Sequence, residues 1–161
     1  MDQDLTLRRK YALKAHGRRI VLIKKAYERH SHVMMKAFLW ALYLPIYPDM
    51  LLEIYVNDRY KPDVVDLDDL NIPKFWGEAG RLGLNKIRSL FRRYPNTHFA
   101  ISKWEQSIEP YERIFKDAVA RLRRTRPINL IHFSKDSPER FIGGDGEIHI
   151  SHNDLEWIRI D

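Results

Sequence analysis

The longest apolar stretch of the chain, VMMKAFLWALYLPIYP at residues 33–48, constrains the fold more than any other segment. A lysine interrupts it and prolines end it, so it is too short and too broken to span a bilayer. Over residues 27–44 apolar side chains lie nearly all round a helix, which is typical of a buried helix. We therefore expect a core helix that the rest of the chain covers, and no membrane partner.

Short strand patterns follow this helix and then alternate with two amphipathic helices. Strands are predicted at residues 50–58, 60–68, 74–80, 98–104 and 128–133, and helices at residues 82–94 and 107–124. Residues 146–151 and 155–160, joined through His-Asn-Asp, predict a C-terminal hairpin. Consecutive strands followed by alternating elements predict an α/β (α+β) fold with a mixed central β-sheet flanked by helices.

We expect a single domain over residues 19–161, because this length can close one hydrophobic core. Residues 1–18 show little periodicity and predict a basic, mobile N-terminal arm. Residues 19–23 (RIVLI) fit either a short strand or the lead into the first helix. The chain has no cysteine, which excludes disulfides and thiolate metal sites, and its start lacks the apolar region of a secretory signal. We expect a cytoplasmic protein.

The net charge of +6 and a pI near 9.5 point towards a polyanionic partner. Basic residues cluster near the N-terminus and again at residues 121–126, and contacts from such clusters to phosphates release counterions. A solvated surface without a partner explains the same charge. We predict nucleic acid as the partner, contacted by Arg18, Arg19, Lys24, Lys25 and Lys103.

Two carboxylates form the candidate catalytic pattern. Asp63 follows a proline at the start of one expected strand, and Glu78 lies in the next, so pairing of these strands brings the two together. Two carboxylates suit Mg²⁺ or Mn²⁺, and a nearby lysine can activate water or stabilise negative charge. Strand periodicity predicts that a residue at position 80 emerges beside Glu78, but Gly80 stands there. Lys86, near the start of the following helix, is the candidate replacement.

Each of these residues also has an ordinary structural interpretation. Asp63 fits a turn aspartate, Glu78 a surface or salt-bridged strand residue, and Lys86 a solvated lysine beside an apolar stripe. The chain has seven histidines, but His30 and His32 point to different faces of a helix, and we find no carboxylate partner at ligand spacing. We interpret both as surface side chains that assist only if they border the acidic pair.

Three segments resemble the YaeQ family of bacterial proteins within the PD-(D/E)XK nuclease superfamily. They are VMMKAFLWAL at residues 33–42, FWGEAGRLGLNKI at residues 75–87 and GEIHISHNDLEWIRI at residues 146–160. The resemblance implies a restriction-endonuclease-like αβββαβ core with Asp63 and Glu78 as the acidic pair. It makes Gly80 an expected family feature, places a basic residue near Lys86, and suggests Glu28 as a further glutamate on the first helix.

Two functions follow as hypotheses. The first is Mg²⁺- or Mn²⁺-dependent hydrolysis of nucleic-acid phosphodiesters by Asp63, Glu78 and Lys86, with the metal held by Asp63 and Glu78. The alternative is a catalytically degenerate nuclease fold that acts as a nucleic-acid-binding or protein-interaction module. A small α/β protein whose charge serves solubility alone is a third possibility.

Overall fold

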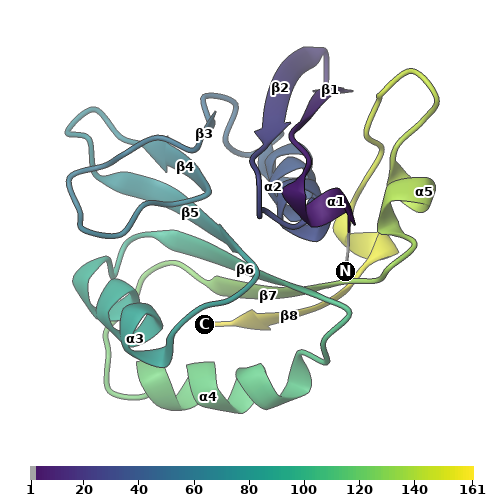
Figure 1. Ribbon diagram of the computed structural model, residues 1–161. Coiled ribbons are helices and arrows are strands. Elements are labelled where there is room, and N and C mark those ends of the chain that lie inside the picture. The colour runs from purple at the N-terminus through teal and green to yellow at the C-terminus, as the bar shows by residue number, and fades with distance from the viewer. Residues whose placement is uncertain (1–2) are drawn as a thin grey trace.

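The structure, a computed structural model, describes residues 3–161, and its centre is a six-stranded mixed sheet (Figure 1). The strands follow one another across the sheet in chain order. They are β3 (Leu51–Leu52), β4 (Val64–Leu67), β5 (Pro73–Ala79), β6 (His98–Trp104), β7 (Ile128–Phe133) and β8 (Glu156–Ile160). Strands β3, β4 and β5 are antiparallel, β5, β6 and β7 are parallel, and β8 returns antiparallel to β7. The mixed sheet flanked by helices confirms the predicted fold class.

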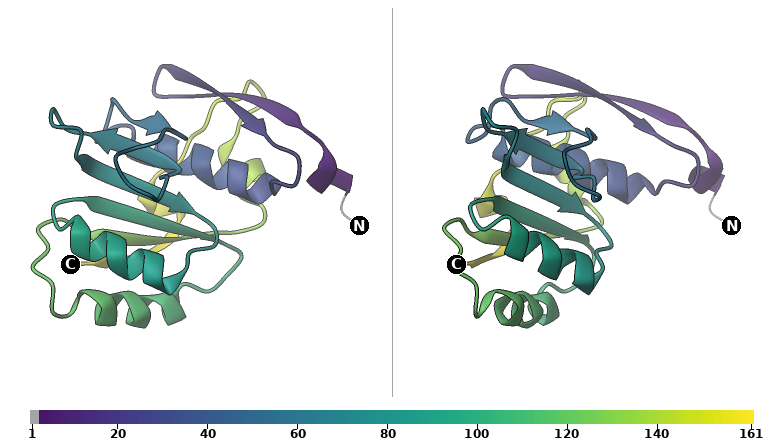
Figure 2. Two further views of the ribbon diagram at one scale, coloured as in Figure 1. Left: turned by 60° about the vertical axis from the view of Figure 1, so that its left-hand side comes forward. Right: turned by 90° about the vertical axis from the view of Figure 1, so that its left-hand side faces the viewer.

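Helices cover both faces of this sheet (Figure 2). Helix α2 (His30–Tyr43) packs on one face, while α3 (Leu84–Arg93) and α4 (Glu109–Val119) pack on the other. The division follows the strand period: in β5, Phe75 belongs to the core under α2, and its neighbour Trp76 belongs to the core under α3 and α4. Within residues 3–161, no helix combines the length and apolarity needed to cross a bilayer.

The first part of the chain differs from the expected mobile arm. After α1 (Gln3–Thr6), β1 (Arg9–Ala15) pairs antiparallel with β2 (Arg18–Lys24), so residues 19–23 form a strand. A two-residue turn at His16 and Gly17, both with positive φ, joins them, as the twist of a tight hairpin requires. Leu13 and Ala15 are buried against α2. The prediction of an unstructured arm is therefore wrong for β1, because alternate side chains of this basic segment enter the core.

The predicted C-terminal hairpin is also wrong. Strand β8 pairs with β7, while the segment before it forms isolated bridges from Glu147 to Lys14 and from Ile148 to Ile142. A 3₁₀ turn, η1 (His152–Asp154), separates the two segments. The short helix α5 (Ser137–Phe141) lies between β7 and these bridges in the chain. The strand expected at residues 50–58 is confined to Leu51–Leu52, since Glu53 adopts a positive φ of 56° and ends it.

Candidate functional site

Asp63 and Glu78 meet across the β4–β5 pair. Asp63 immediately precedes β4, and its N–H donates to the carbonyl of Gly77 at 3.1 Å. Val64 pairs with Gly77 at the end of the β4–β5 register, so Asp63 lies just beyond the paired residues, next to the end of β5 that carries Glu78 and Ala79. The two carboxylates turn to different faces of the sheet, Asp63 towards His32 of α2 and Glu78 towards Lys86 of α3. The two acidic residues therefore lie close together at one end of the β4–β5 pair, near enough for the charge of Asp63 to act on Glu78.

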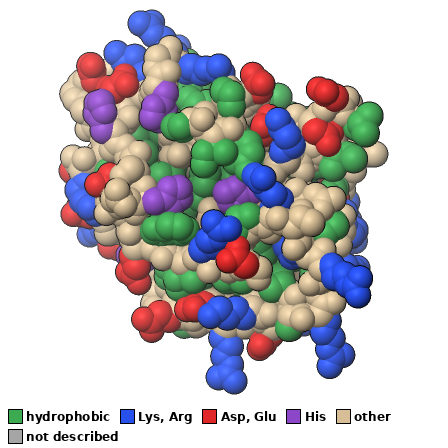
Figure 3. All heavy atoms as spheres, turned by 180° about the vertical axis from the view of Figure 1, so that it is seen from behind, with side chains coloured by type: hydrophobic (Ala, Val, Ile, Leu, Met, Phe, Trp, Pro, Cys, Tyr) green, Lys and Arg blue, Asp and Glu red, His purple; other side chains and the backbone are tan. Residues whose placement is uncertain are grey.

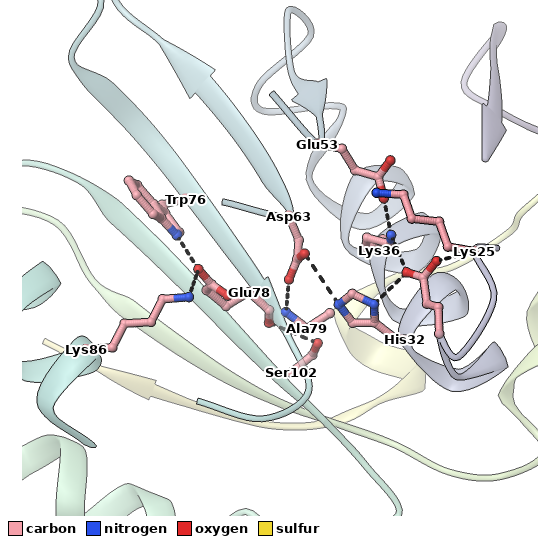
Figure 4. A network of polar contacts seen from close by, with 11 residues as sticks. Lys25, His32, Lys36, Glu53, Asp63, Trp76, Glu78, Ala79, Lys86 and Ser102 are labelled. Carbon is pink, nitrogen blue, oxygen red and sulfur yellow. Dashed lines mark hydrogen bonds and ion pairs between the residues drawn. The ribbon is translucent and has the colours of Figure 1, made fainter. Parts of the chain in front are cut away.

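The Glu78 carboxylate is buried and receives two donors on the same oxygen. The indole N–H of Trp76 donates to Oε1 at 2.8 Å, and the Lys86 ammonium lies 3.1 Å from Oε1 (Figure 4). Lys86 comes from α3, which covers the face of the sheet into which Trp76 points. Burial and then the negative charge of Asp63 raise the pKa of Glu78 to about 7, against the lowering effect of Lys86 and Trp76.

Asp63 turns its two oxygens towards different partners. Oδ2 accepts the N–H of Ala79 at 2.8 Å, which fixes the carboxylate against β5. Oδ1 lies 3.4 Å from Nε2 of His32 on α2 (Figure 4). Burial opposes a charge on His32, but hydrogen bonds and attraction to Asp63, together with Glu28, raise the pKa of this histidine overall. Asp63 thus links the acidic pair to the first turn of α2.

A second cluster of charges continues behind His32. Nδ1 of His32 lies 2.8 Å from Oε2 of Glu28, and the same oxygen accepts from the ammonium of Lys36 at 2.8 Å. Lys36 is only 2% exposed and also donates to Glu53. Burial raises the pKa of Glu28, but donors from Lys36, the Lys25 N–H and His32 outweigh it and hold the pKa at about 2. Glu28 therefore stays a carboxylate, just before α2 and not on it.

Gly80 does not stand where strand periodicity predicts. Strand β5 ends at Ala79, and Gly80 has a φ of +87°, so the alternation of side chains is broken there. A Cβ built at Gly80 points towards Met35 and His32 on the α2 side, at 3.7 Å and 3.9 Å. The expectation that a lysine here would emerge beside Glu78 is therefore wrong. Lys86 reaches Glu78 from the opposite face of the sheet.

The predicted nucleic-acid contacts are scattered. Lys24 and Lys103 are 2% and 3% exposed. Their ammonium groups donate to backbone carbonyls, Lys24 to Leu7 at 2.6 Å and Lys103 to Gly80 at 2.8 Å. Burial of these ammonium groups removes both lysines from a phosphate-binding surface. Lys25 is exposed near the site, beside Glu28.

Arg18 and Arg19 are exposed but lie at the far end of α2. Arg18 donates to the carbonyl of Pro48, beyond the C-terminus of this helix, whereas His32 lies in its first turn. The 14 residues of α2 span about 21 Å. Seen from behind, the molecule shows Lys and Arg interspersed with Asp and Glu around a centre of histidine and apolar side chains (Figure 3). The net charge of the chain therefore forms no continuous basic surface on that face.

Two solved structures share this architecture. The crystal structure of a YaeQ protein from Pseudomonas syringae matches over 92% of this chain and 83% of its own, with a TM-score of 0.58 and 14% identity. That of a YaeQ protein from Xanthomonas axonopodis pv. citri matches over 83% of this chain and 76% of its own, with a TM-score of 0.50 and 15% identity. The chain has a YaeQ-like fold. No protein-family model matches the sequence, and no curated protein is significantly similar to it.

The YaeQ-like fold brings residues to the site that sequence reasoning missed. His32 was interpreted as a surface side chain without a carboxylate partner, yet it contacts both Glu28 and Asp63. The separation of four residues between Glu28 and His32 was a usable signal, because a side chain just before a helix can reach the first turn, as Glu28 does here. Lys36 carried a second signal, since a lysine inside an apolar helical run needs a buried partner. Trp76 is fully buried, and its indole N–H orients the Glu78 carboxylate.

Proposed function

We propose that this protein hydrolyses nucleic-acid phosphodiesters as a PD-(D/E)XK-type nuclease, with Asp63 and Glu78 as metal ligands and Lys86 as the catalytic cation. One observation carries the proposal: the Lys86 ammonium lies 3.1 Å from the buried Glu78 carboxylate although it comes from a different element. The αβββαβ order of α2, β3, β4, β5, α3 and β6 supports the superfamily assignment.

The donor set fits Mg²⁺ or Mn²⁺. Both are hard cations that prefer oxygen ligands, and Mg²⁺ keeps several waters, so two carboxylates can suffice. Burial and then the negative charge of Asp63 raise the pKa of Glu78, and a divalent cation held by Asp63 and Glu78 would favour the charged form of both carboxylates. Trp76 and Lys86 both engage Oε1 of Glu78, so Oε2 is the oxygen we assign to the metal.

Each residue then has a defined task. Bound metal supplies charge neutralisation of the phosphate and a more acidic water. Trp76 fixes the Glu78 carboxylate, and the Ala79 N–H fixes that of Asp63, so both ligands are oriented in advance. The ammonium of Lys86 stabilises negative charge that develops on the phosphate. Hydrolysis adds water across one P–O bond and leaves a phosphate monoester and a hydroxyl.

The test is cleavage of single- and double-stranded DNA and RNA in Mn²⁺ by the wild type and by Asp63→Asn and Glu78→Gln. We expect cleavage by the wild type and a loss of at least a hundredfold in each variant. Asp69→Asn, an exposed carboxylate in the loop after β4, is the matched control and should cleave normally. Cleavage by the Asp63→Asn, Glu78→Gln double variant at the wild-type rate would contradict the site assignment.

A degenerate nuclease fold that binds nucleic acid without cutting it is the second candidate. It is favoured by one observation: among residues 3–161, no group of three or more His, Asp or Glu side chains is placed to hold a metal. This candidate predicts salt-sensitive binding that persists in EDTA and in the Asp63→Asn, Glu78→Gln double variant. It predicts no cleavage by the wild type in Mn²⁺.

A further inference from the structure

A basic groove lies beside the acidic pair, between the start of α2, the end of β6 and α5. Its volume is about 360 Å³, which is within the range of small-ligand sites. Arg9 of β1, Arg29 before α2, Trp104 of β6 and Lys135 before α5 line it, with Glu139 as the acidic residue of the lining. In Figure 1 these elements come together around the N-terminal end of the described chain.

The cations of this groove are available to a ligand. Arg9, Arg29 and Lys135 are exposed. Among residues 3–161, no ion pair or hydrogen bond to a carboxylate involves these three, and Arg9 lies over the ring of Tyr11 at 5.0 Å from its centroid. Lys24 also lines the groove, but its ammonium donates to the carbonyls of Leu5 and Leu7. The groove therefore has three uncompensated positive charges against one negative charge, which suits consecutive phosphates.

Trp104 adds a flat apolar surface to the same groove. Its side chain is partly buried against the core under α2 and also lines the groove. The ring makes no aromatic or cation–π contact with any residue among 3–161, in contrast to Trp76, which packs against Tyr94 and Phe99. An indole face beside cationic side chains is the pattern by which proteins stack unpaired bases while their charges hold the backbone.

The groove is continuous with the candidate active site along the chain. Ser31 lines the groove, and the next residue, His32, contacts Asp63. On the other side, Trp104 follows Lys103, whose ammonium donates to the carbonyl of Gly80, two residues after Glu78. The carboxyl ends of the parallel strands β5 and β6 lie side by side, so Glu78 near the end of β5 and Trp104 at the end of β6 belong to the same edge of the sheet.

We propose that this groove binds one unpaired nucleic-acid strand, with a base stacked on Trp104 and phosphates held by Arg9, Arg29 and Lys135. The identity of the ligand, a nucleic acid, rests on the proposed function. The binding measurement does not, because it is made without divalent metal and therefore without cleavage. A base inside a duplex is already stacked between its neighbours and would have to leave the duplex to stack on Trp104. We therefore assign a single-stranded ligand to the groove.

The experiment is fluorescence anisotropy of labelled 12-mer dT and U oligonucleotides in EDTA over a range of salt concentrations. We expect the Arg9→Gln, Arg29→Gln, Lys135→Gln triple variant to lower the slope of log Kd against log salt by about two, at roughly 0.7 per lost contact. Trp104→Ala should weaken binding about fivefold to a hundredfold, and Trp104→Phe should retain most of the affinity. Thermal melts establish that every variant is folded.

A matched triple variant, Arg113→Gln, Arg121→Gln, Arg123→Gln, removes three exposed cations in and after α4, on the opposite face of the sheet. It loses the same charge and should keep both the wild-type slope and affinity.

Equal salt slopes and affinities of the two triple variants would overturn the proposal that the groove binds nucleic acid. Competition by a blunt 12-base-pair duplex or by polyglutamate that equals competition by the single strand would also overturn it. If the groove variants bind normally while Asp63→Asn abolishes cleavage, the groove is wrong and the proposed function stands. If binding depends on Trp104 but the wild type never cleaves, the proposed function fails and the groove stands.

Discussion

The ammonium nitrogen of Lys86 lies 3.1 Å from Oε1 of Glu78, although one residue belongs to helix α3 and the other to strand β5. In the proposed nuclease site, the positive charge next to the two carboxylates therefore comes from helix α3. Helix α3 is held in this position by Ile87, Leu90 and Phe91, which are buried against the sheet. The position of the ammonium is thus set by packing of the helix.

Replacement of Lys86 by methionine should lower kcat/KM for cleavage by about a hundredfold or more, because the developing charge on the phosphate loses its cation. Methionine keeps much of the apolar stem, but the buried Glu78 carboxylate loses its cation, so the variant should also be less stable wherever Glu78 is ionised, and cleavage is compared below its melting temperature. Arg88→Met, an exposed position two residues further along α3, is the control and should cleave like the wild type. Equal rates for Lys86→Met and Arg88→Met would remove Lys86 from the catalytic set.

A lysine at position 80 should not take over the role proposed for Lys86. Its φ of +87° costs a side-chain-bearing residue about 1–2 kcal/mol, while the space for a Cβ is open to ordinary contacts at 3.7 Å. Gly80→Ala should therefore destabilise the protein by about 1–2 kcal/mol in urea unfolding. Gly80→Lys should not restore cleavage to Lys86→Met, because its side chain leaves on the α2 side. Recovery of activity in that double variant would show that the chain can bring this lysine to Glu78.

The sequence predicts the positions of the central strands better than it predicts which strands pair with one another. Strands β6 and β7 match the predicted residues, because continuous apolar runs bounded by turns define central strands locally. The predicted hairpin failed because β8 finds its hydrogen bonds on β7, a choice that only the assembled sheet determines. Strand β1 was missed although Tyr11, Leu13 and Ala15 alternate inward, because its exposed basic residues dominate its composition.

In the candidate site, likewise, some features were predictable from the sequence and others were not. The proximity of Asp63 to Glu78 was predictable from strand spacing, and that of Lys86 to Glu78 from its position near the start of the following helix. The direction of the side chain at position 80 was not, because it depends on a positive φ that the sequence leaves open for glycine. The burial of Lys24 was also hidden, since its partners are backbone carbonyls of residues 5, 7 and 25, which carry no sequence signal.

Lys36 should be required for stability, because it neutralises Glu28 and Glu53 from a buried position. Lys36→Met leaves the half-buried Glu28 carboxylate without its main cation and should cost about 3 kcal/mol in urea unfolding. Glu53→Gln should cost about 1 kcal/mol or less, since Glu53 is 29% exposed and water replaces the lost partner. Adding Glu28→Gln to Lys36→Met should recover part of the loss. A cost for Lys36→Met as small as that for Glu53→Gln would contradict this role.

Glu78 should make the protein less stable as the pH rises. Its pKa is raised from 4.5 to about 7 in the folded state, so its contribution is fully present below pH 4.5 and is lost as the pH rises through 7. The shift corresponds to about 3 kcal/mol. Glu78→Gln should therefore stabilise the protein by up to about 3 kcal/mol at pH 8 and by little at pH 4. Mn²⁺ should raise the melting temperature of the wild type at pH 8 but not that of Glu78→Gln. An equal rise in the melting temperature of both proteins would show that Glu78 does not contribute to metal binding.

His98 should make the protein less stable as the pH falls, which is the opposite pH dependence to that of Glu78. Burial lowers its pKa from 6.5 to about 4, outweighing the hydrogen bond to Asn129. The neutral ring donates from Nε2 to Oδ1 of Asn129 at 2.6 Å and accepts at Nδ1 from the hydroxyl of Tyr47 at 2.9 Å, so both nitrogens are satisfied without a charge. Because the folded pKa is depressed, this stability is present above pH 6.5 and is lost as the pH falls through 4.

Urea unfolding of the Glu78→Gln variant, which lacks the opposing titration of Glu78, should show a loss of about 3 kcal/mol in the free energy of unfolding between pH 7 and pH 4. Adding His98→Gln should lower stability at pH 7 but remove most of that pH dependence, and an unchanged slope would assign the acid sensitivity to another group.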